Sequence, residues 1–402
     1  MIIIYNLYYH MEEKFKKLNL PEIKTKTISN NLLNHLYFVL KNADKKWLHG
    51  NVNLQTVLFE YKENYDFNKI ANYSYINHNI RLAIEKLGLY HIKYVLEIGK
   101  NKYNISFLYP SKNNKKSEIE DFFEDCIMKM YLWLFIVQPY IRNNCSREMN
   151  INILFSDHKK VLSNNKFEPL NTIHVNTAFT TSCLPKTNVI IFRKEEWFRA
   201  FIHETFHNLG LDFSNMNITT SEQKITQLFN VKSKDEVRVY ESYCEIWAEI
   251  LNVVIISFMI TNNKESFKKE FQKNMILERK FSFFQMAKIL HHFDITYDEF
   301  IDNDKKKFFE ENSHITSYFF IKTILMYFFS DFENWCKEMN KNNIFQFELT
   351  QNNIDSFLDF IEEHYKRKEF IQTLHLYENF FKNNKYNKNS VMRTLRMSLN
   401  EL

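Results

Sequence analysis

The scarcity of glycine and proline restricts the fold of this chain more than any other feature. Only 4 glycines and 5 prolines occur in 402 residues. Glycine supplies the left-handed backbone of tight turns and proline interrupts helices, so a chain poor in both favours long helices and disfavours glycine-rich phosphate loops. The 39 Phe and 22 Tyr residues provide apolar surface for a large core. The length suits two or three packed units.

Hydrophobic periodicity predicts a mixed first half and a helical second half. Residues 11–92 read as mainly helical, and the segments flanking Gly99 read as a β-hairpin. Further strands are expected over 150–155, 172–181 and 188–192. Helices are expected over 118–137, 194–209, 233–260 (capped by Ser233 and Glu236), 264–293, 313–338, 350–365 and 368–383.

A change in composition near residue 215 indicates the domain organisation. We expect an N-terminal helical region with a hairpin (1–110), an α/β region (111–215) and a helical C-terminal part (216–402). The predicted fold class is therefore α+β, with a small mixed sheet followed by a large all-helical part.

Charge and cysteine usage exclude several classes of protein. The net charge of +5 falls short of a nucleic-acid-binding composition, and the basic tail 382–396 is expected to be solvated. No apolar run is long enough to span a bilayer, so no membrane partner is expected. The five cysteines are odd in number and lack a C-x-x-C pair, which predicts reduced thiols in a cytoplasm-like compartment.

The stretch His203-Glu204-Thr205-Phe206-His207 is the strongest chemical signal in the chain. Two imidazoles four residues apart lie on one face of a helix, so a single element can offer two ligands to one metal ion. Glu204, next to the first histidine, can take a proton from a water molecule at the metal. Gly210 follows the helix and is expected to cap it in the left-handed conformation.

A row of carboxylates downstream offers a third ligand. Glu241, Glu245 and Glu249 recur at a spacing of four on a helix whose other positions are bulky and apolar. Like charges in such a row repel, and an apolar segment needs a cation to neutralise them. A metal ion is one such cation.

With these two elements the chain resembles zincin metallopeptidases of the gluzincin type, in which a glutamate from a later helix completes the site. The resemblance rests on His203 to His207 and on Glu245-Ile246-Trp247-Ala248-Glu249, and covers residues 150–260. It implies a zincin-like fold, Zn²⁺ bound by His203, His207 and Glu245, and Glu204 as general base. Glu249 would accept a hydrogen bond from the second ring nitrogen of a ligand imidazole. Glu241 would belong, like Glu249, to the residues that surround the metal ligands.

Two alternatives to this ligand set stay open. Metzincins extend the motif beyond the glycine to a further ligand, but that position is Phe213 here and Asp212 lies one residue early. The choice among the three glutamates of the row also stays open, and the Ala248-Glu249 context is what favours Glu245.

The resemblance implies hydrolysis of a peptide or protein substrate. The oxyanion formed during hydrolysis needs a further donor. His314 and Tyr318, one helical turn apart, are the candidates, with Tyr240, Tyr243 and the pair His291 and His292 as alternatives. The competing function is a catalytically silent zincin-fold protein whose helical part binds a partner. A nucleic-acid binder using the basic tail is a third class, for which the composition gives little support.

Overall fold

The computed structural model describes residues 11–23, 29–110, 116–166, 168–233, 237–302, 309–341, 343–384 and 390–401. The chain forms two compact units, each assembled from separate stretches. Unit 1 comprises residues 1–30, 160–176 and 212–402, and unit 2 comprises residues 31–159 and 177–211. The fold class is mixed α and β, as expected.

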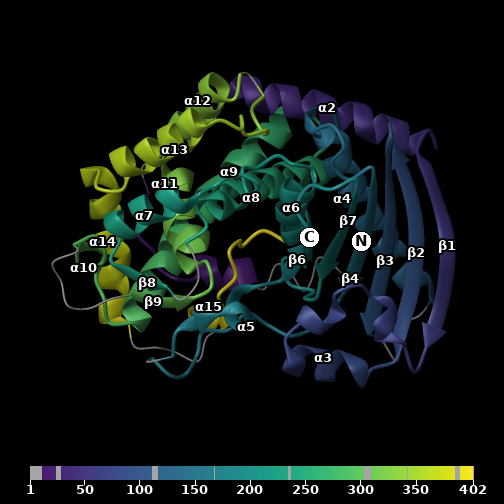
Figure 1. The fold of residues 1–402 in the computed structure, drawn as a ribbon, viewed down its shortest axis with the longest axis horizontal. Helices are drawn as coiled ribbons and strands as arrows, with labels where there is room; N and C mark the ends of the chain where they lie inside the picture. The colour runs from purple at the N-terminus through teal and green to yellow at the C-terminus, as the bar shows by residue number, and fades with distance from the viewer. Residues whose placement is uncertain are drawn as a thin grey trace. The chain divides into compact units, whose positions relative to one another are not determined.

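Unit 2 is built on a six-stranded mixed sheet of order β1-β2-β3-β4-β7-β6 (Figure 1). The pairs β3–β4 and β4–β7 are parallel, and the other pairs are antiparallel. Its strands are β1 (Asn53–Lys62), β2 (Leu89–Ile98), β3 (Asn101–Pro110), β4 (Glu148–Leu154), β6 (Ala178–Thr180) and β7 (Lys186–Ile191). Its helices are α2 (Asn30–Leu48), η1 (Phe67–Lys69), η2 (Tyr73–Tyr75), α3 (His78–Glu85), α4 (Lys116–Val137), η3 (Gln138–Tyr140) and α6 (Trp197–Asn208).

The two faces of this sheet carry different residues, because successive side chains of a strand point to opposite faces. Ile105, Ile151 and Val189 represent the first face, where the alternate positions of β3, β4 and β7 are apolar and buried. Helix α6 contacts strands β6 and β7, and α4 contacts α6. The core of unit 2 therefore includes the motif helix.

The second face is apolar at only one end. There Leu108, Leu154 and Ile190 pack in one cluster with the segment 65–87, whose apolar residues include Phe67 and Ile80. On the same face, the rows of residues that cross the strands nearer the amino ends of β4 and β7 are polar and lie outside that cluster.

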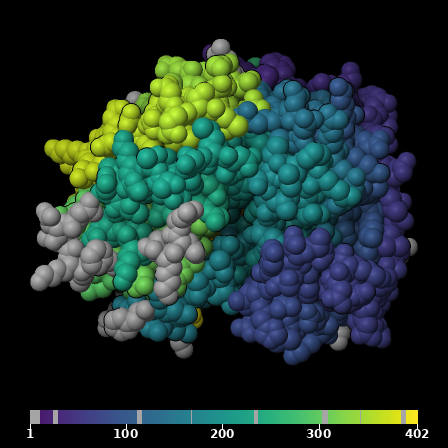
Figure 2. Space-filling view, viewed as in Figure 1, coloured from purple at the N-terminus to yellow at the C-terminus, as the bar shows by residue number. Residues whose placement is uncertain are grey.

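Unit 1 is mainly helical and contains a small parallel sheet of order β5-β9-β8. Helices α12 and α13 form part of its exposed surface (Figure 2, yellow-green). Its elements are β5 (Leu170–Asn171), α5 (Thr172–Val175), α7 (Thr219–Leu228), β8 (Val231–Ser233), α8 (Val239–Met259), α9 (Lys264–His292), α10 (Tyr297–Phe300), β9 (Phe309–Asn312), η4 (Thr316–Ile321), α11 (Lys322–Tyr327), α12 (Phe329–Met339), α13 (Gln351–His364), α14 (Lys368–Asn383) and α15 (Ser390–Arg393).

Helix α8 is the most apolar element of unit 1. Its length and composition would let it cross a membrane, yet 94% of its most apolar window is buried inside the protein. A helix that is buried in a protein core can have the same length and the same apolar composition. Its neighbours in unit 1 include α9, α11 and η4.

Several predicted elements differ from the structure. Strand β1 lies in a stretch expected to be helical, and its pairing with β2 is a contact that local periodicity does not register. The strand expected over 172–181 is divided into α5 and β6. Ser233 belongs to β8 and so does not cap α8, which begins at Val239, and Glu236 lies outside the described residues. The helix expected over 313–338 is divided into η4, α11 and α12.

The expected regions also divide differently. The hairpin β2–β3 shares its sheet with β4 and β7, so residues of the first two expected regions belong to one unit. The later division falls after Leu211, four residues before the expected boundary. The α/β region ends where the motif helix ends.

Two expectations about cysteines and the tail are wrong. Cys145 and Cys183 form a disulfide with a Cα separation of 4.8 Å, whereas Cys126, Cys244 and Cys336 are free and buried. The end of the basic tail is also not solvated, since eight of the ten residues over 390–399 are buried. Its apolar side chains provide the reason, because burying them removes apolar surface from water.

Candidate metal centre

Helix α6 carries the motif and is anchored within unit 2 by buried contacts. Its residues 197–208 are all buried. The indole Nε1 of Trp133 donates to Thr205 Oγ1 over 2.8 Å, and the Trp133 ring stacks on Phe206 with ring centroids 5.7 Å apart. Both contacts lie inside the HETFH sequence, so α4 fixes the rotation of α6 about its axis.

The end of α6 is closed by Gly210, as expected. Gly210 has φ +68°, its N–H donates to His207 O over 3.2 Å, and Leu211 N–H donates to Phe206 O over 2.9 Å. This pair of bonds is a Schellman motif. A Cβ atom at Gly210 would lie 2.8 Å from Cys145 Sγ and 2.9 Å from Arg142 Cδ. Glycine is therefore required both by the backbone angle and by the space.

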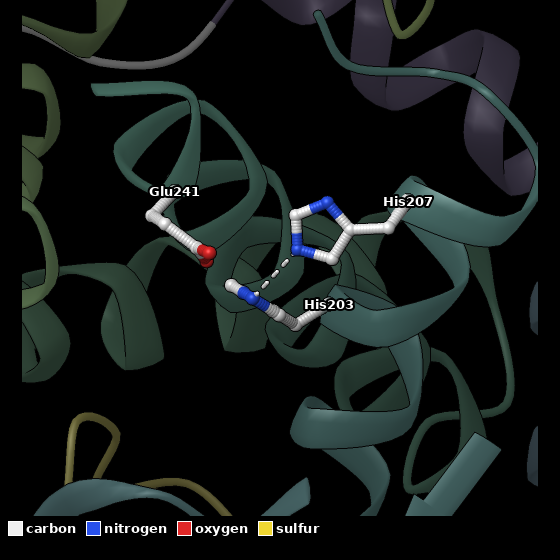
Figure 3. Close-up of side chains that lie close together, drawn as sticks. All are labelled: His203, His207 and Glu241. Atoms are coloured by element: carbon white, nitrogen blue, oxygen red, sulfur yellow. Dashed lines mark hydrogen bonds between the residues drawn. The ribbon is translucent and has the colours of Figure 1, made fainter. Parts of the chain in front are cut away.

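The two motif imidazoles face each other on α6. His203 Nε2 and His207 Nε2 are 3.3 Å apart, and both side chains are buried (Figure 3). Two nitrogens bound to one tetrahedral zinc at about 2.0–2.1 Å are separated by roughly 3.3–3.4 Å. The geometry of the pair therefore fits a shared zinc ion. Glu204, between them in sequence, is 8% exposed.

The structure brings Glu241 together with the histidine pair. Each of His203, His207 and Glu241 offers one ligand atom, and these atoms all lie within 4.8 Å of one another (Figure 3). Two imidazole nitrogens and one carboxylate oxygen form a donor set that zinc accepts. The three residues could therefore hold a metal ion. Glu241 is in the first turn of α8, one turn before Glu245.

A second group shares one of these histidines. His207, Asp212 and Cys244 also offer ligand atoms within 4.8 Å of one another, and all three are buried. Within unit 1 the Cys244 thiol donates to Asp212 Oδ2 over 3.7 Å. No sequence pattern points to Cys244, because a cysteine on an apolar helix is usually a core residue.

Glu245 and Glu249 have different surroundings. Glu245 is 3% exposed, and the groups that could bind a metal among the described residues contain Glu241 in its place. Its assignment as a ligand stays a prediction. Both oxygens of Glu249 accept hydrogen bonds, Oε2 from Lys322 Nζ over 2.6 Å and Oε1 from Ser282 Oγ over 3.4 Å. The cation beside this carboxylate is therefore a lysine, which no sequence pattern predicts.

The predicted oxyanion donors His314 and Tyr318 lie in unit 1. Their rings are perpendicular, with centroids 5.8 Å apart, and Tyr318 belongs to the π-helical turn η4. Ser317 Oγ of the same turn donates to Arg238 O, directly before α8, over 2.9 Å. π-Helical turns are frequent at functional sites. The roles of the two residues stay predictions.

Tyr243, one of the alternative donors, is part of the core. Its hydroxyl donates to Phe345 O over 3.3 Å and accepts from Asn340 Nδ2 over 3.1 Å, and its side chain is fully buried. Burial raises the pKa of this phenol well above its usual value. These contacts are those of a structural tyrosine.

Comparison with known proteins adds no further identification. No family model, no curated protein and no solved structure matches this chain.

Proposed function

We propose that this protein is a zinc-dependent metallopeptidase of the zincin type. His203 and His207 supply two ligands and a glutamate of α8 supplies the third, with Glu241 favoured over Glu245. The observation that carries the proposal is the 3.3 Å separation of the two Nε2 atoms, which matches a pair of zinc ligands. A glutamate directly after the first histidine supports a hydrolytic rather than a structural site.

The chemistry follows from the types of residue present. A zinc ion at this position would lower the pKa of water to about 7 and polarise a peptide carbonyl. The Glu204 carboxylate accepts the proton of the attacking water and delivers it to the leaving amine nitrogen. Burial of Glu204 and of both imidazoles keeps bulk water away and strengthens these interactions. His314 or Tyr318 would donate a hydrogen bond to the oxyanion.

Metal content and hydrolysis together test the proposal. We expect about one zinc per chain, measured by inductively coupled plasma mass spectrometry, in both the parent protein and Glu204→Gln. Only the parent should hydrolyse fluorescently quenched casein, with the variant slower by about 10²–10⁴-fold because it lacks the general base. A parent without zinc, or a His203→Ala variant that retains zinc, contradicts the site. Equal zinc in both proteins without hydrolysis in either favours the catalytically silent alternative.

The identity of the third ligand is tested by a matched pair of substitutions on α8. Glu241→Gln and Glu245→Gln remove one negative charge each from adjacent turns of the same buried helix. We expect a large loss of zinc affinity for Glu241→Gln and a smaller loss for Glu245→Gln, measured by competition with a chelator. A larger loss of zinc affinity in Glu245→Gln than in Glu241→Gln would instead identify Glu245 as the ligand.

A further inference from the structure

A chain of hydrogen bonds in unit 2 links a carboxylate, an imidazole and a hydroxyl. Glu60 Oε1 lies 3.2 Å from His91 Nδ1, and His91 Nε2 lies 2.9 Å from Ser106 Oγ. With the Nδ1 proton directed at the carboxylate, Nε2 accepts the serine proton. This is the order of groups that activates a serine nucleophile in hydrolases of unrelated fold.

The register of the sheet creates this arrangement. Glu60 of β1 is opposite His91 of β2, and Lys93, two residues further along β2, is opposite Ser106 of β3. His91 and Ser106 are therefore diagonal neighbours on one face. Tyr65 packs edge-on against His91 with centroids 5.0 Å apart, and the imidazole is only 3% exposed. The Tyr65 ring and the hydrogen bonds to Glu60 and Ser106 together fix the orientation of the imidazole.

Ser106 lines a cavity of about 400 Å³ over the polar rows of the same face. Asn104 Nδ2 donates to Asn150 Oδ1 over 2.9 Å, and Asn150 Nδ2 donates to Asn188 Oδ1 over 3.2 Å, which forms a row of amides across three strands. Asparagine is depleted in strands. An in-register row of amides beneath an open cavity is therefore unusual and provides hydrogen-bonding groups for a ligand.

A fourth asparagine is placed to stabilise an oxyanion. Asn152 of β4 is directly opposite Ser106 in the register of β3 and β4, and it lines the cavity. It forms no side-chain hydrogen bond with the residues that the structure describes. Side-chain amides that donate to an oxyanion are established catalytic groups. The Asn152 amide is thus available beside the hydroxyl.

We propose that Ser106, His91 and Glu60 form a second catalytic site, separate from the metal centre, that hydrolyses small esters. Ser106 Oγ bonds to the ester carbonyl carbon while its proton passes to His91 Nε2. The carbon–oxygen bond to the alcohol breaks, and His91 returns the proton to the leaving oxygen. Water then gives a proton to His91 Nε2 and bonds to the acyl carbon. The bond from that carbon to Ser106 Oγ breaks and His91 returns the proton to Oγ, which releases the acid and restores Ser106.

The charges around the cavity indicate the substrate class. Lys93 lines the cavity opposite Ser106, and Lys69 lines it from the segment 65–87. Lys93 forms no ion pair with the described residues, so its ammonium is available to a ligand. Since Lys93 neighbours the nucleophile, the site is suited to a short acyl group that ends in a carboxylate.

The protonation state of His91 suits a base. Burial lowers the pKa of His91, and Lys93 and Lys62 lower it further, whereas Glu60 raises it. The imidazole is therefore neutral near pH 7. Glu60 also pairs with Lys62 over 2.7 Å, which helps to fix the carboxylate.

Covalent labelling tests the proposal in the full-length protein. Diisopropyl fluorophosphate should modify Ser106, identified by peptide mass mapping, and Glu60→Gln should label at least tenfold more slowly. Glu60 is partly exposed, so this variant should keep its thermal midpoint. p-Nitrophenyl hemisuccinate should be hydrolysed faster than p-nitrophenyl acetate, and Lys93→Ala should remove that preference. A chelator of zinc should change none of these rates.

A matched pair of asparagine variants examines the oxyanion donor. Asn152→Asp replaces the amide beside Ser106 with a group that repels an oxyanion, and Asn79→Asp makes the same change at an exposed position of α3 that does not line the cavity. We expect ester hydrolysis to fall by at least tenfold in the first variant only. Labelling of other serines in preference to Ser106, or ester hydrolysis that survives Ser106→Ala unchanged, overturns the proposal. Loss of hydrolysis on zinc removal would also overturn it.

Discussion

Lys322 shows how a single residue can balance a buried carboxylate. Its side chain is 1% exposed, that of Glu249 is 0% exposed, and the two are joined at 2.6 Å. Lys322 Nζ also donates to Ser282 Oγ over 2.9 Å and to Met397 O over 3.2 Å. All three ammonium protons therefore have acceptors. Burying such a pair is tolerated because both charges are satisfied.

Removing one partner should leave an uncompensated charge in the core. We expect Lys322→Met to lower the free energy of unfolding by about 3–5 kcal/mol. The double variant Lys322→Met, Glu249→Leu should recover most of that loss. Urea unfolding measures both values. The control is Lys224→Met, which breaks the surface pair with Asp359 (side chains 30% and 70% exposed) and should cost less than about 1 kcal/mol.

The same double variant separates two roles of Glu249. If Glu249 orients a ligand imidazole, its loss should weaken zinc binding by about 10–100-fold. If its role is the ion pair with Lys322, zinc affinity should be the same in the parent and in the double variant. We expect the second result, because both carboxylate oxygens already accept hydrogen bonds from Lys322 and Ser282.

At the scale of the element, two helices of unit 2 end in the same way but in different surroundings. Gly50 follows α2 with φ +66°, and a Cβ atom added there would meet no other atom within 4 Å, whereas Gly210 follows α6 with φ +68° in a filled space. Gly50 N–H donates to Trp47 O and Asn51 N–H donates to Lys46 O, as in the cap of α6. The pair therefore separates the cost of the backbone angle from the cost of the clash.

Alanine at the two positions should give different losses of stability. We expect Gly50→Ala to cost about 1–2 kcal/mol, which is the penalty of a left-handed alanine. Gly210→Ala should cost at least about 1 kcal/mol more, because Cys145 or Arg142 must move. Thermal unfolding measures both. Only Gly210→Ala should also weaken zinc binding, since His207 lies in the last turn of α6. Equal losses of stability in Gly50→Ala and Gly210→Ala would show that Cys145 and Arg142 move aside without measurable cost.

Elements that depend on local sequence were predicted well. The hairpin around Gly99, helix α4, helix α6 with its cap, and the helices α9, α13 and α14 match the periodicity of their residues. Strand β1 and the partners of Glu249 were not predicted, because each depends on residues distant in the sequence. The motif likewise identified the histidine pair, whereas the spacing of the three glutamates on α8 does not distinguish Glu241 from Glu245.

At the scale of the whole molecule, the last residues that the structure describes are bound to helix α9 of unit 1 by buried hydrogen bonds. Glu278 of α9 is fully buried, and its carboxylate accepts from the N–H groups of Leu399 over 3.0 Å and Asn400 over 2.7 Å and from Ser398 Oγ over 2.8 Å. Lys288 of the same helix donates to Val391 O and Thr394 O. One helix thus holds the backbone of this segment through two buried polar side chains.

Substituting Glu278 should release this segment. We expect Glu278→Ala to lower the free energy of unfolding by about 2–4 kcal/mol, because several donors lose a charged acceptor. Brief proteolysis followed by mass spectrometry should detect new cleavage after residue 390. The control Glu270→Ala on the same helix removes a partly exposed carboxylate paired with Lys273 and should leave both measurements nearly unchanged. Unchanged proteolysis in Glu278→Ala would contradict this role.

The division of the chain between the two units has a consequence for its synthesis. The polypeptide passes from one unit to the other four times, and unit 2 is complete once residue 211 has been added, whereas unit 1 needs residues on both sides of that point. On the ribosome the sheet of unit 2 can therefore form first. Residues 1–30 and 160–176 belong to unit 1, which cannot be completed until residues 212–402 have been synthesised. Neither unit can be produced by cutting the gene once, and a nascent chain stopped near residue 212 would expose the unpaired segments to chaperones.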